Sequence, residues 1–192
     1  MQITGRWHQL SVLVLRVSVG IIFLWAGLEK LIGAGEKAWT AAGFLKFGTA
    51  GTLGWPFVTG TPVEGTVYNP THDFWVNLAG NDGAMTLVNF LVVFGECAIG
   101  IALILGAFSR FAALMGALMM FLFFLSAWDF AYGIVNQHLT YMVVCLTIAA
   151  LDSGRYLGLD PMIASTGFAR RNGWFRAWFL SGDPAPAVQT TA

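Results

Sequence analysis

Four long apolar segments dominate the hydrophobic pattern of the chain. They run from about Leu10 to Leu31, Met85 to Gly106, Phe111 to Phe130 and Ile134 to Gly154. Each has about 20 residues, enough for a helix to cross a hydrocarbon core of about 30 Å. Helices satisfy every backbone polar group in such a segment without help from water. The pattern therefore predicts an all-α protein, a polytopic membrane four-helix bundle.

The connection between the first two spans, residues 32–84, is too long to be a simple loop. The aromatic residues of Glu36–Phe47 are spaced for one face of a short interfacial helix. The segment His72–Ala79 is predicted to form a second short helix. We interpret this long connection as a cap over the outer ends of the bundle.

The amino-acid composition of the chain changes after the fourth span. Residues Phe168–Leu180 mix arginines with tryptophans and phenylalanines, a composition that suits the membrane interface. A docking surface for a partner protein is the alternative. Residues 181–192 are rich in Pro, Ala and Thr and are predicted to be disordered. The predicted division is a transmembrane domain at 1–160, an interfacial segment at 161–180 and the tail.

Arginines gather at one set of helix ends. They precede the first span, occupy the turn between the second and third, and follow the fourth: Arg6, Arg110, Arg155, Arg170, Arg171 and Arg176. The connection 131–133 contains neither Lys nor Arg. Positive residues favour the cytoplasmic side of short connections, so both termini are predicted to be cytoplasmic and the long loop extracytoplasmic.

The overall composition supports a membrane protein and argues against some partners. Of the 192 residues, 57% are hydrophobic and only 10% are charged, whereas soluble domains carry about 25% charged residues. The formal net charge is zero and the basic residues are dispersed, so we expect no nucleic-acid partner. The lipid bilayer is the partner that the composition predicts.

Glu96 lies inside the second span, where an ionised group costs about 2.5 kcal/mol or more on insertion scales. Such a group faces the bundle interior and a polar partner. Helical spacing places Arg16 and Asp152 on the inner faces of the first and fourth spans. We therefore predict an inner network of these residues, extended by Arg110 and Arg155. A structural brace and a proton or quinone-head site both remain open as its role.

The same helical faces carry glycines. Gly20 lies one turn from Arg16, and Gly100 lies one turn from Glu96. Small residues let membrane helices approach closely, so we expect the polar faces of the spans to converge.

A second polar group lies at the predicted outer helix ends. It consists of Glu29, Lys30, Asp129, Asn136 and His138. Taken singly, the carboxylates are interpreted as solvated surface groups. Taken together beneath an aromatic loop, the group is a candidate pocket for an anion or a quinone head. His138 is able to donate to a quinone carbonyl and to change charge near neutral pH.

The histidines and cysteines do not form the patterns expected for a haem or a metal site. Of His8, His72 and His138, only His138 falls in a span, so a haem held by two histidines is not expected. Cys97 and Cys145 belong to no metal or redox motif, and we interpret them as packing residues, with a redox pair as the alternative. We expect no metal site and no intrinsic cofactor, and quinone is the one candidate ligand.

Three stretches resemble the DoxX/DoxD family of small four-helix membrane proteins. They are Leu15–Leu31, Gly95–Gly106 with Ser109 and Arg110, and Asn136–Tyr141 leading to Leu151–Gly154. The resemblance covers about residues 10–160 and implies the four-helix fold and a bacterial or archaeal cytoplasmic membrane. Arg16, Glu96 and Asp152 match family-typical polar positions, and no catalytic role is implied for them.

Some DoxD-type members are similar to the membrane subunit of thiosulfate:quinone oxidoreductase, which pairs with a smaller subunit. Others are associated with respiratory oxidases or oxidative-stress complexes. The resemblance therefore implies a membrane subunit of a quinone-linked redox or respiratory electron-transfer complex, with other membrane subunits as partners. The alternative is a non-catalytic accessory subunit that stabilises a larger respiratory or photosynthetic complex. Whether the chain is itself an enzyme stays open. A solute carrier is disfavoured because no inverted repeat is present.

Overall fold

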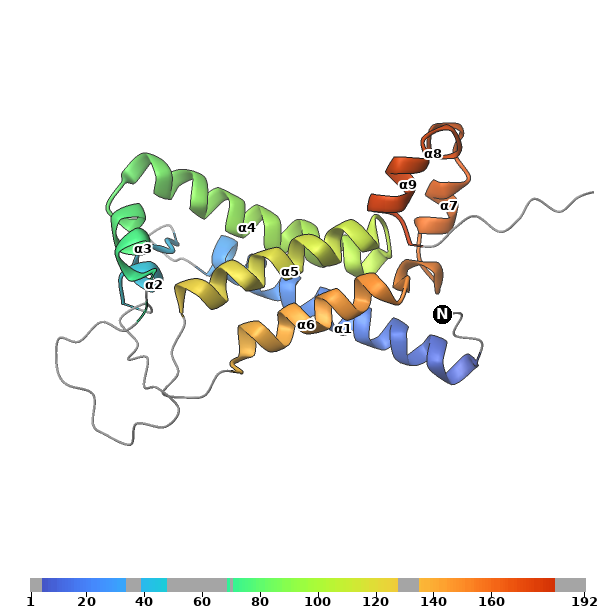
Figure 1. The fold of residues 1–192 in the computed structure, drawn as a ribbon, viewed down its shortest axis with the longest axis horizontal. Helices are drawn as coiled ribbons and strands as arrows, with labels where there is room; N and C mark the ends of the chain where they lie inside the picture. Colours follow the sequence, from blue (N-terminus) through green and yellow to red (C-terminus); the bar gives the residue numbers. More distant parts are fainter. Residues whose placement is uncertain (1–4, 34–38, 48–68, 70, 128–134, 182–192) are drawn as a thin grey trace, which may run out of the picture. The chain divides into compact units, whose positions relative to one another are not determined.

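The computed structural model describes residues 5–33, 39–47, 69, 71–127 and 135–181, and helices make up its regular structure (Figure 1). In chain order they are α1 (Arg6–Ile32), α2 (Ala42–Phe47), α3 (His72–Ala79), α4 (Asp82–Leu105), α5 (Ser109–Ser126), α6 (Gln137–Ala150), the 3-10 turn η3 (Ser153–Arg155), α7 (Asp160–Ala164), α8 (Gly167–Arg171) and α9 (Gly173–Phe179). No strand occurs among the described residues. The predicted all-α class is confirmed.

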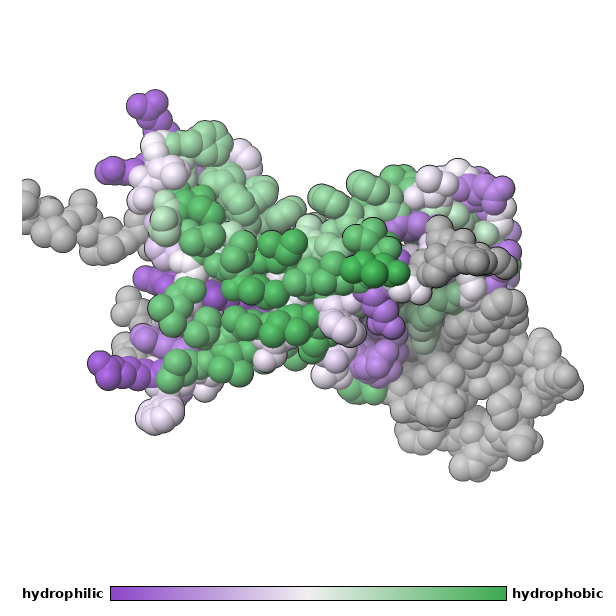
Figure 2. All heavy atoms as spheres, turned by 180° about the vertical axis from the view of Figure 1, so that it is seen from behind, coloured by the Kyte–Doolittle hydropathy of each residue, from purple (hydrophilic) through white to green (hydrophobic). Residues whose placement is uncertain are grey.

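Three of these helices are long and apolar enough to cross a membrane. They are α1, α4 and α5, while α6 is apolar but has only 14 residues. Hydrophobic side chains cover much of the surface in view (Figure 2), and large ones such as Val14, Trp25 and Phe94 are exposed on the long helices. Exposed apolar side chains along such helices belong in contact with lipid. The chain is therefore a multi-pass membrane protein.

The fourth apolar segment departs from its predicted bounds. It was expected to stay helical to Gly154, but α6 ends at Ala150 and Asp152 has a left-handed φ of 50°. Asp152 and Arg155 therefore leave the helical face on which the periodicity placed them. The backbone turns there because its carbonyl groups bond to a buried arginine from α1, as described below.

The two short loop helices differ in how well they were predicted. The bounds of α3 match the prediction. α2 begins at Ala42, so Trp39 lies outside it, and Glu36 falls outside the described residues. Side chains cap its start: Asn89 Oδ1 accepts from the amide of Ala41 at 2.9 Å, and Thr40 Oγ1 accepts from that of Ala42 at 3.2 Å. These caps satisfy amides that lack partners at a helix N-terminus.

The chain divides into two compact units. Unit 1 comprises residues 1–26, 96–116 and 145–192, and unit 2 comprises 27–95 and 117–144. Every arginine belongs to unit 1: Arg6, Arg16, Arg110, Arg155, Arg170, Arg171 and Arg176. The lysines among the described residues, Lys30 and Lys46, belong to unit 2. The arginines, which are most of the basic residues, therefore all belong to unit 1.

Within unit 1, α1 and α4 cross in close contact at glycines. A Cβ atom added to Gly100 would lie 2.5 Å from the backbone nitrogen of Leu24 and 2.8 Å from the carbonyl oxygen of Gly20. A Cβ atom added to Gly20 would lie 2.9 Å from Ile104 Cγ1. Two helix backbones approach this closely only where both lack side chains. The expected contact between these helical faces is present.

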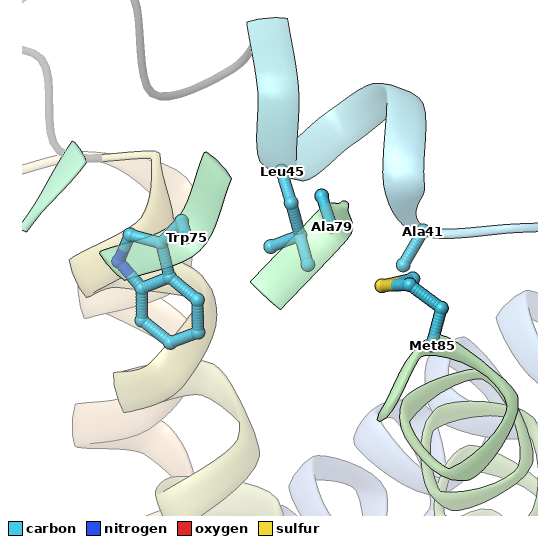
Figure 3. Packing of buried hydrophobic residues seen from close by; sticks show 5 residues of the cluster. All are labelled: Ala41, Leu45, Trp75, Ala79 and Met85. Carbon is cyan, nitrogen blue, oxygen red and sulfur yellow. The ribbon is translucent and has the colours of Figure 1, made fainter. Parts of the chain in front are cut away.

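Unit 2 has a compact hydrophobic core beside α2 and α3. Ala41 and Leu45 come from the α2 region, Trp75 and Ala79 from α3, and Met85 from α4 (Figure 3). Leu45 lies beside Ala79, and Met85 lies beneath Ala41 (Figure 3). The core fixes α2 and α3 against the first turn of α4. The long connection is therefore partly a packed structure.

The C-terminal helices of unit 1 form a small core of their own. Ala164, Ala169 and Leu180 are buried in it, with Phe175 and Phe179 packed against them. Figure 1 shows α7, α8 and α9 close together. This arrangement gives the interfacial segment a folded core.

We predict that Gly100→Ala destabilises the protein by about 1–3 kcal/mol, the usual cost of overpacking a close contact. The added methyl group has no room between α1 and α4, and the opposing atoms include backbone that cannot rotate away. Thermal unfolding in mild detergent measures the change. Gly173→Ala is the matched control because a Cβ atom there meets nothing within 4 Å. Equal unfolding temperatures for the two variants would show that the close crossing is wrong.

Candidate functional site

The most buried charged group is Arg16, on α1 in unit 1. Its side chain is fully buried. Nη1 donates to the carbonyl oxygens of Ser153 at 2.7 Å and Tyr156 at 3.3 Å, and Nη2 donates to that of Leu157 at 3.3 Å. The planar guanidinium presents several donors at fixed angles, which suits it to a group of converging carbonyls. Arg16 thus binds the backbone that follows α6.

Two glycines make room for this guanidinium. A Cβ atom on Gly106 would lie 2.6 Å from Arg16 Nη1, and one on Gly158 would lie 2.9 Å from it. Gly106 also has a φ of 64°, which favours glycine. The amide of Asp160 donates to the carbonyl of Gly106 at 2.9 Å, joining the end of α4 to the same segment. Arg16 is therefore enclosed by backbone from two parts of unit 1, the end of α4 and the segment 153–158.

A buried carboxylate, Asp160, balances the charge of Arg16. The two side chains attract each other electrostatically, and both are fully buried. Asp160 Oδ2 accepts from the amide of Ser109 at 3.3 Å and that of Ser181 at 3.0 Å, and also from the Ser109 hydroxyl. Ser181 Oγ lies 2.9 Å from Ser109 Oγ and accepts from the amide of Gly154 at 3.2 Å. We call Arg16, Asp160, Ser109 and Ser181 the arginine cluster.

The pairing of charges differs from the predicted network. Asp152 was expected to be a partner of Arg16, but it forms an ion pair with Arg110. The cause is the early end of α6, which moves Asp152 away from the helical face assumed for it. Arg110 Nη1 also donates to the carbonyl of Ala177 in α9 at 2.6 Å. Arg155 is exposed to solvent.

Glu96 lies on α4 in unit 1 and is only 2% exposed. Its carboxylate is therefore shielded from lipid. Its burial fits the general behaviour of ionisable groups in membrane spans, which face the protein interior and mark functional candidates.

Sequence reasoning missed Asp160, Ser109 and Ser181. Asp160 precedes a proline at the start of α7, a pattern that suggests only a helix N-terminus. Ser181 was assigned to a disordered tail by composition, but it is buried, while residues 182–192 lie outside the described part. The Asp-Pro pair at the boundary was the one available signal.

In unit 2, His138 on α6 contacts two phenylalanine rings. Its ring centroid lies 6.3 Å from that of Phe44 on α2 and 5.9 Å from that of Phe123 on α5, both edge to face. The two phenyl rings are 6.1 Å apart, also edge to face. We call these three residues the aromatic triad. No hydrogen bond joins either ring nitrogen of His138 to another described residue.

Polar side chains hold the elements that carry the triad. Asn89 caps α2, as described above. Asn69 Nδ2 and Thr71 Oγ1 donate to the carbonyl of Leu125, near the end of α5, at 3.1 and 3.0 Å. Asn136 Oδ1 accepts from the amide of Leu139 at 3.0 Å and caps α6. These hydrogen bonds therefore hold in place the helices that carry the aromatic triad.

The other residues of the predicted outer group have separate contacts. Lys30 Nζ lies 5.3 Å from the ring centroid of Trp39, a cation–π arrangement. Glu29 is exposed, and Asn136 serves as a helix cap. Asp129 lies outside the described residues. Of the predicted group, His138 is the residue that the structure surrounds with aromatic rings, and the sequence did not identify Phe44 and Phe123 as its neighbours.

We predict that Arg16→Met lowers the free energy of unfolding by about 3–5 kcal/mol, because it leaves Asp160 as a buried charge without its cation. It also leaves the carbonyls of Ser153, Tyr156 and Leu157 without their donor. Thermal unfolding in mild detergent measures the loss. The control Arg155→Met removes an exposed arginine and should change stability by about 0.5 kcal/mol or less.

The partnership of Arg16 with Asp160 is tested by a double-mutant cycle. In the background of Asp160→Asn, Arg16→Met should cost less than in the natural protein, with a coupling energy of roughly 0.5–3 kcal/mol. The reason is that the neutral amide introduced by Asp160→Asn no longer needs a compensating cation. Strictly additive effects would contradict the pairing described here.

A family model named DoxX matches residues 11–128, which include α1, α4 and α5 and therefore Arg16, Glu96 and Arg110. The match ends before α6, so Asp160 lies beyond it. No curated protein and no solved structure matches the chain. Because the family model covers more than half of its length, this membrane protein belongs to the DoxX family.

Proposed function

We propose that the protein is a membrane subunit of a quinone-linked redox complex and that the aromatic triad binds the quinone head. One observation carries the proposal: the His138 imidazole is held against Phe44 and Phe123 with no hydrogen bond from its ring nitrogens to another described residue. His138 is half-buried beside these rings, so its ring N–H still needs a hydrogen-bond partner. A ligand carbonyl meets that need.

The chemistry of the triad suits a quinone. A quinone head is a flat, largely apolar ring with two carbonyl acceptors, and when bound it accepts electrons and protons. Phe44 and Phe123 offer apolar ring edges and faces to such a head. An imidazole N–H donates to a carbonyl oxygen.

We assign a role in proton handling to Glu96. Its carboxylate is buried on a membrane-spanning helix, where ionisable residues commonly serve proton pathways. The electrons would come from a partner subunit of the complex, and other membrane subunits are the proposed partners. The proposed location is the cytoplasmic membrane of a bacterium or archaeon.

The charge distribution supports a defined orientation. All arginines belong to unit 1, and its connecting segment between α4 and α5 carries Arg110 at the first turn of α5. Short connections rich in arginine stay in the cytoplasm. We infer that both termini and the connection from α4 to α5 are cytoplasmic and that the loop carrying α2 and α3 is extracytoplasmic.

A second candidate function is an accessory subunit without chemistry of its own. The arginine cluster favours it, because its hydrogen bonds join α1 to the segment after α6 and act as a brace. A protein built only to stabilise a larger respiratory or photosynthetic complex needs such a brace and no bound quinone. The two candidates predict different outcomes in the experiments below.

We predict that the protein purified in mild detergent retains about one quinone per chain and that His138→Phe weakens quinone binding about threefold to tenfold, the loss expected for one hydrogen bond. Phenylalanine keeps a ring at this position but removes the donor. Extraction of the bound quinone followed by titration measures occupancy and affinity. His8→Phe is the matched control, because His8 is exposed on α1 in the other unit.

A natural protein without bound quinone would refute the proposed function and favour the accessory subunit. If His138→Phe bound quinone with unchanged affinity, any quinone site would have to lie elsewhere than at the triad.

We predict that Glu96→Gln lowers quinone-linked turnover by roughly 100-fold, within the usual contribution of a positioned acid or base, while assembly of the complex is preserved. Glutamine keeps the size of the side chain but cannot exchange a proton. Turnover is measured in membranes, and assembly is measured by the size of the complex in native electrophoresis. Preserved turnover with failed assembly would instead make Glu96 a structural residue.

A further inference from the structure

The described surface of unit 1 carries arginines without competing free carboxylates. The unit's described acids are Glu96 and Asp160, which are buried, and Asp152, which pairs with Arg110. Its exposed basic residues include Arg170 and Arg171 on α8. The electrostatic field outside this part of unit 1 is therefore positive and favours anionic partners.

Large aromatic side chains lie close to these arginines in sequence and in the fold. Trp174 and Trp178 are 62% and 63% exposed and lie one helical turn apart on α9, and Phe168 on α8 is 60% exposed. The neighbouring residues Phe175 and Phe179 pack into the C-terminal core instead. Figure 2 shows hydrophilic side chains beside hydrophobic ones on these helices, at the upper left. The exposed rings belong to one side of α9 and the packed rings to another.

Contacts with the first turn of α5 fix where α9 lies. The ring of Phe179 stacks on that of Phe111 with centroids 4.6 Å apart, and Arg110 donates to the carbonyl of Ala177. Phe111 and Arg110 begin a helix that is long and apolar enough to span the membrane. Because α9 is attached to the end of a span, its exposed tryptophans lie near the level of the lipid headgroups.

We propose that Phe168, Arg170, Arg171, Trp174 and Trp178 form a binding surface for anionic phospholipids of the bilayer that holds the protein. Guanidinium groups bind phosphate oxygens in pairs of hydrogen bonds. Tryptophan rings settle at the boundary between headgroups and acyl chains. Basic residues next to a membrane span attract anionic lipid. This inference is independent of the quinone proposal, since it uses only unit 1 surfaces.

A lipid fits these observations better than a partner protein. The surface lies at the end of a span, where lipid headgroups are present around the protein at high local concentration. It combines positive charge with indole rings, which are the two features that bind the interface of an anionic leaflet. We name this set of five residues the lipid surface.

The test is lipid titration of the intact protein in mild detergent. Phosphatidylglycerol and phosphatidylcholine with brominated acyl chains are added separately, and quenching of tryptophan fluorescence is followed. At low salt, half-quenching should need about 25-fold less phosphatidylglycerol than phosphatidylcholine, because each of the two arginines near the surface favours anionic lipid by roughly fivefold. The preference should weaken as salt is added.

Variants of the lipid surface locate the preference. Arg170→Gln combined with Arg171→Gln should bring the two lipids close to equal, and Arg170→Lys with Arg171→Lys should retain most of the preference. Trp174→Phe with Trp178→Phe should remove the part of the quenching that prefers phosphatidylglycerol, while quenching of other exposed tryptophans such as Trp7 and Trp25 remains. Lys46→Gln is the control for loss of a surface charge elsewhere, because Lys46 is exposed on α2 in unit 2. Thermal unfolding confirms that these surface changes leave the fold intact.

Two results would overturn the proposal. One is equal half-quenching by both lipids in the natural protein. The other is an anionic preference that survives the double glutamine variant or is lost equally in Lys46→Gln. A protein that co-purifies through Trp174 and Trp178, without any preference for anionic lipid, would make this surface a protein-docking site instead.

Discussion

The structure depends on one constraint: an arginine buried on a membrane-spanning helix must find partners for its charge and for the Nη atoms of its guanidinium within the protein. Arg16 meets this constraint with the carbonyls of Ser153, Tyr156 and Leu157 and with the charge of Asp160. Because water and lipid offer no substitute at that position, the backbone after α6 turns back toward α1. The early end of α6 and the glycine at position 106 follow from the same requirement.

In unit 2, neutral polar side chains form hydrogen bonds with the backbone groups at the helix ends. Asn89 caps α2, while Asn69 and Thr71 bind the carbonyl of Leu125 near the end of α5. These bonds hold the elements that carry Phe44 and Phe123. Charged groups thus join the elements of unit 1, whereas two phenyl rings flank His138 in unit 2.

Much of the fold could be predicted from the sequence, since span length and apolar composition report directly on transfer into lipid. The bounds of α3 and the glycine contact between α1 and α4 follow from local spacing. The partners of Arg16 could not be predicted, because helical periodicity assumes that the helix continues, and here it ends before Asp152. His138 was identifiable as a lone histidine in a span, but its ring neighbours come from segments distant in sequence, so no local pattern indicates them.

Hydrogen–deuterium exchange of the backbone amides of residues 151–160 tests the central claim most directly. If Arg16 holds this segment, its amides exchange slowly in the natural protein and much faster in Arg16→Met, while the amides in the middle of α5 keep their protection. If the segment exchanges at the same rate in both proteins, Arg16 does not hold the chain after α6, and the account of unit 1 fails.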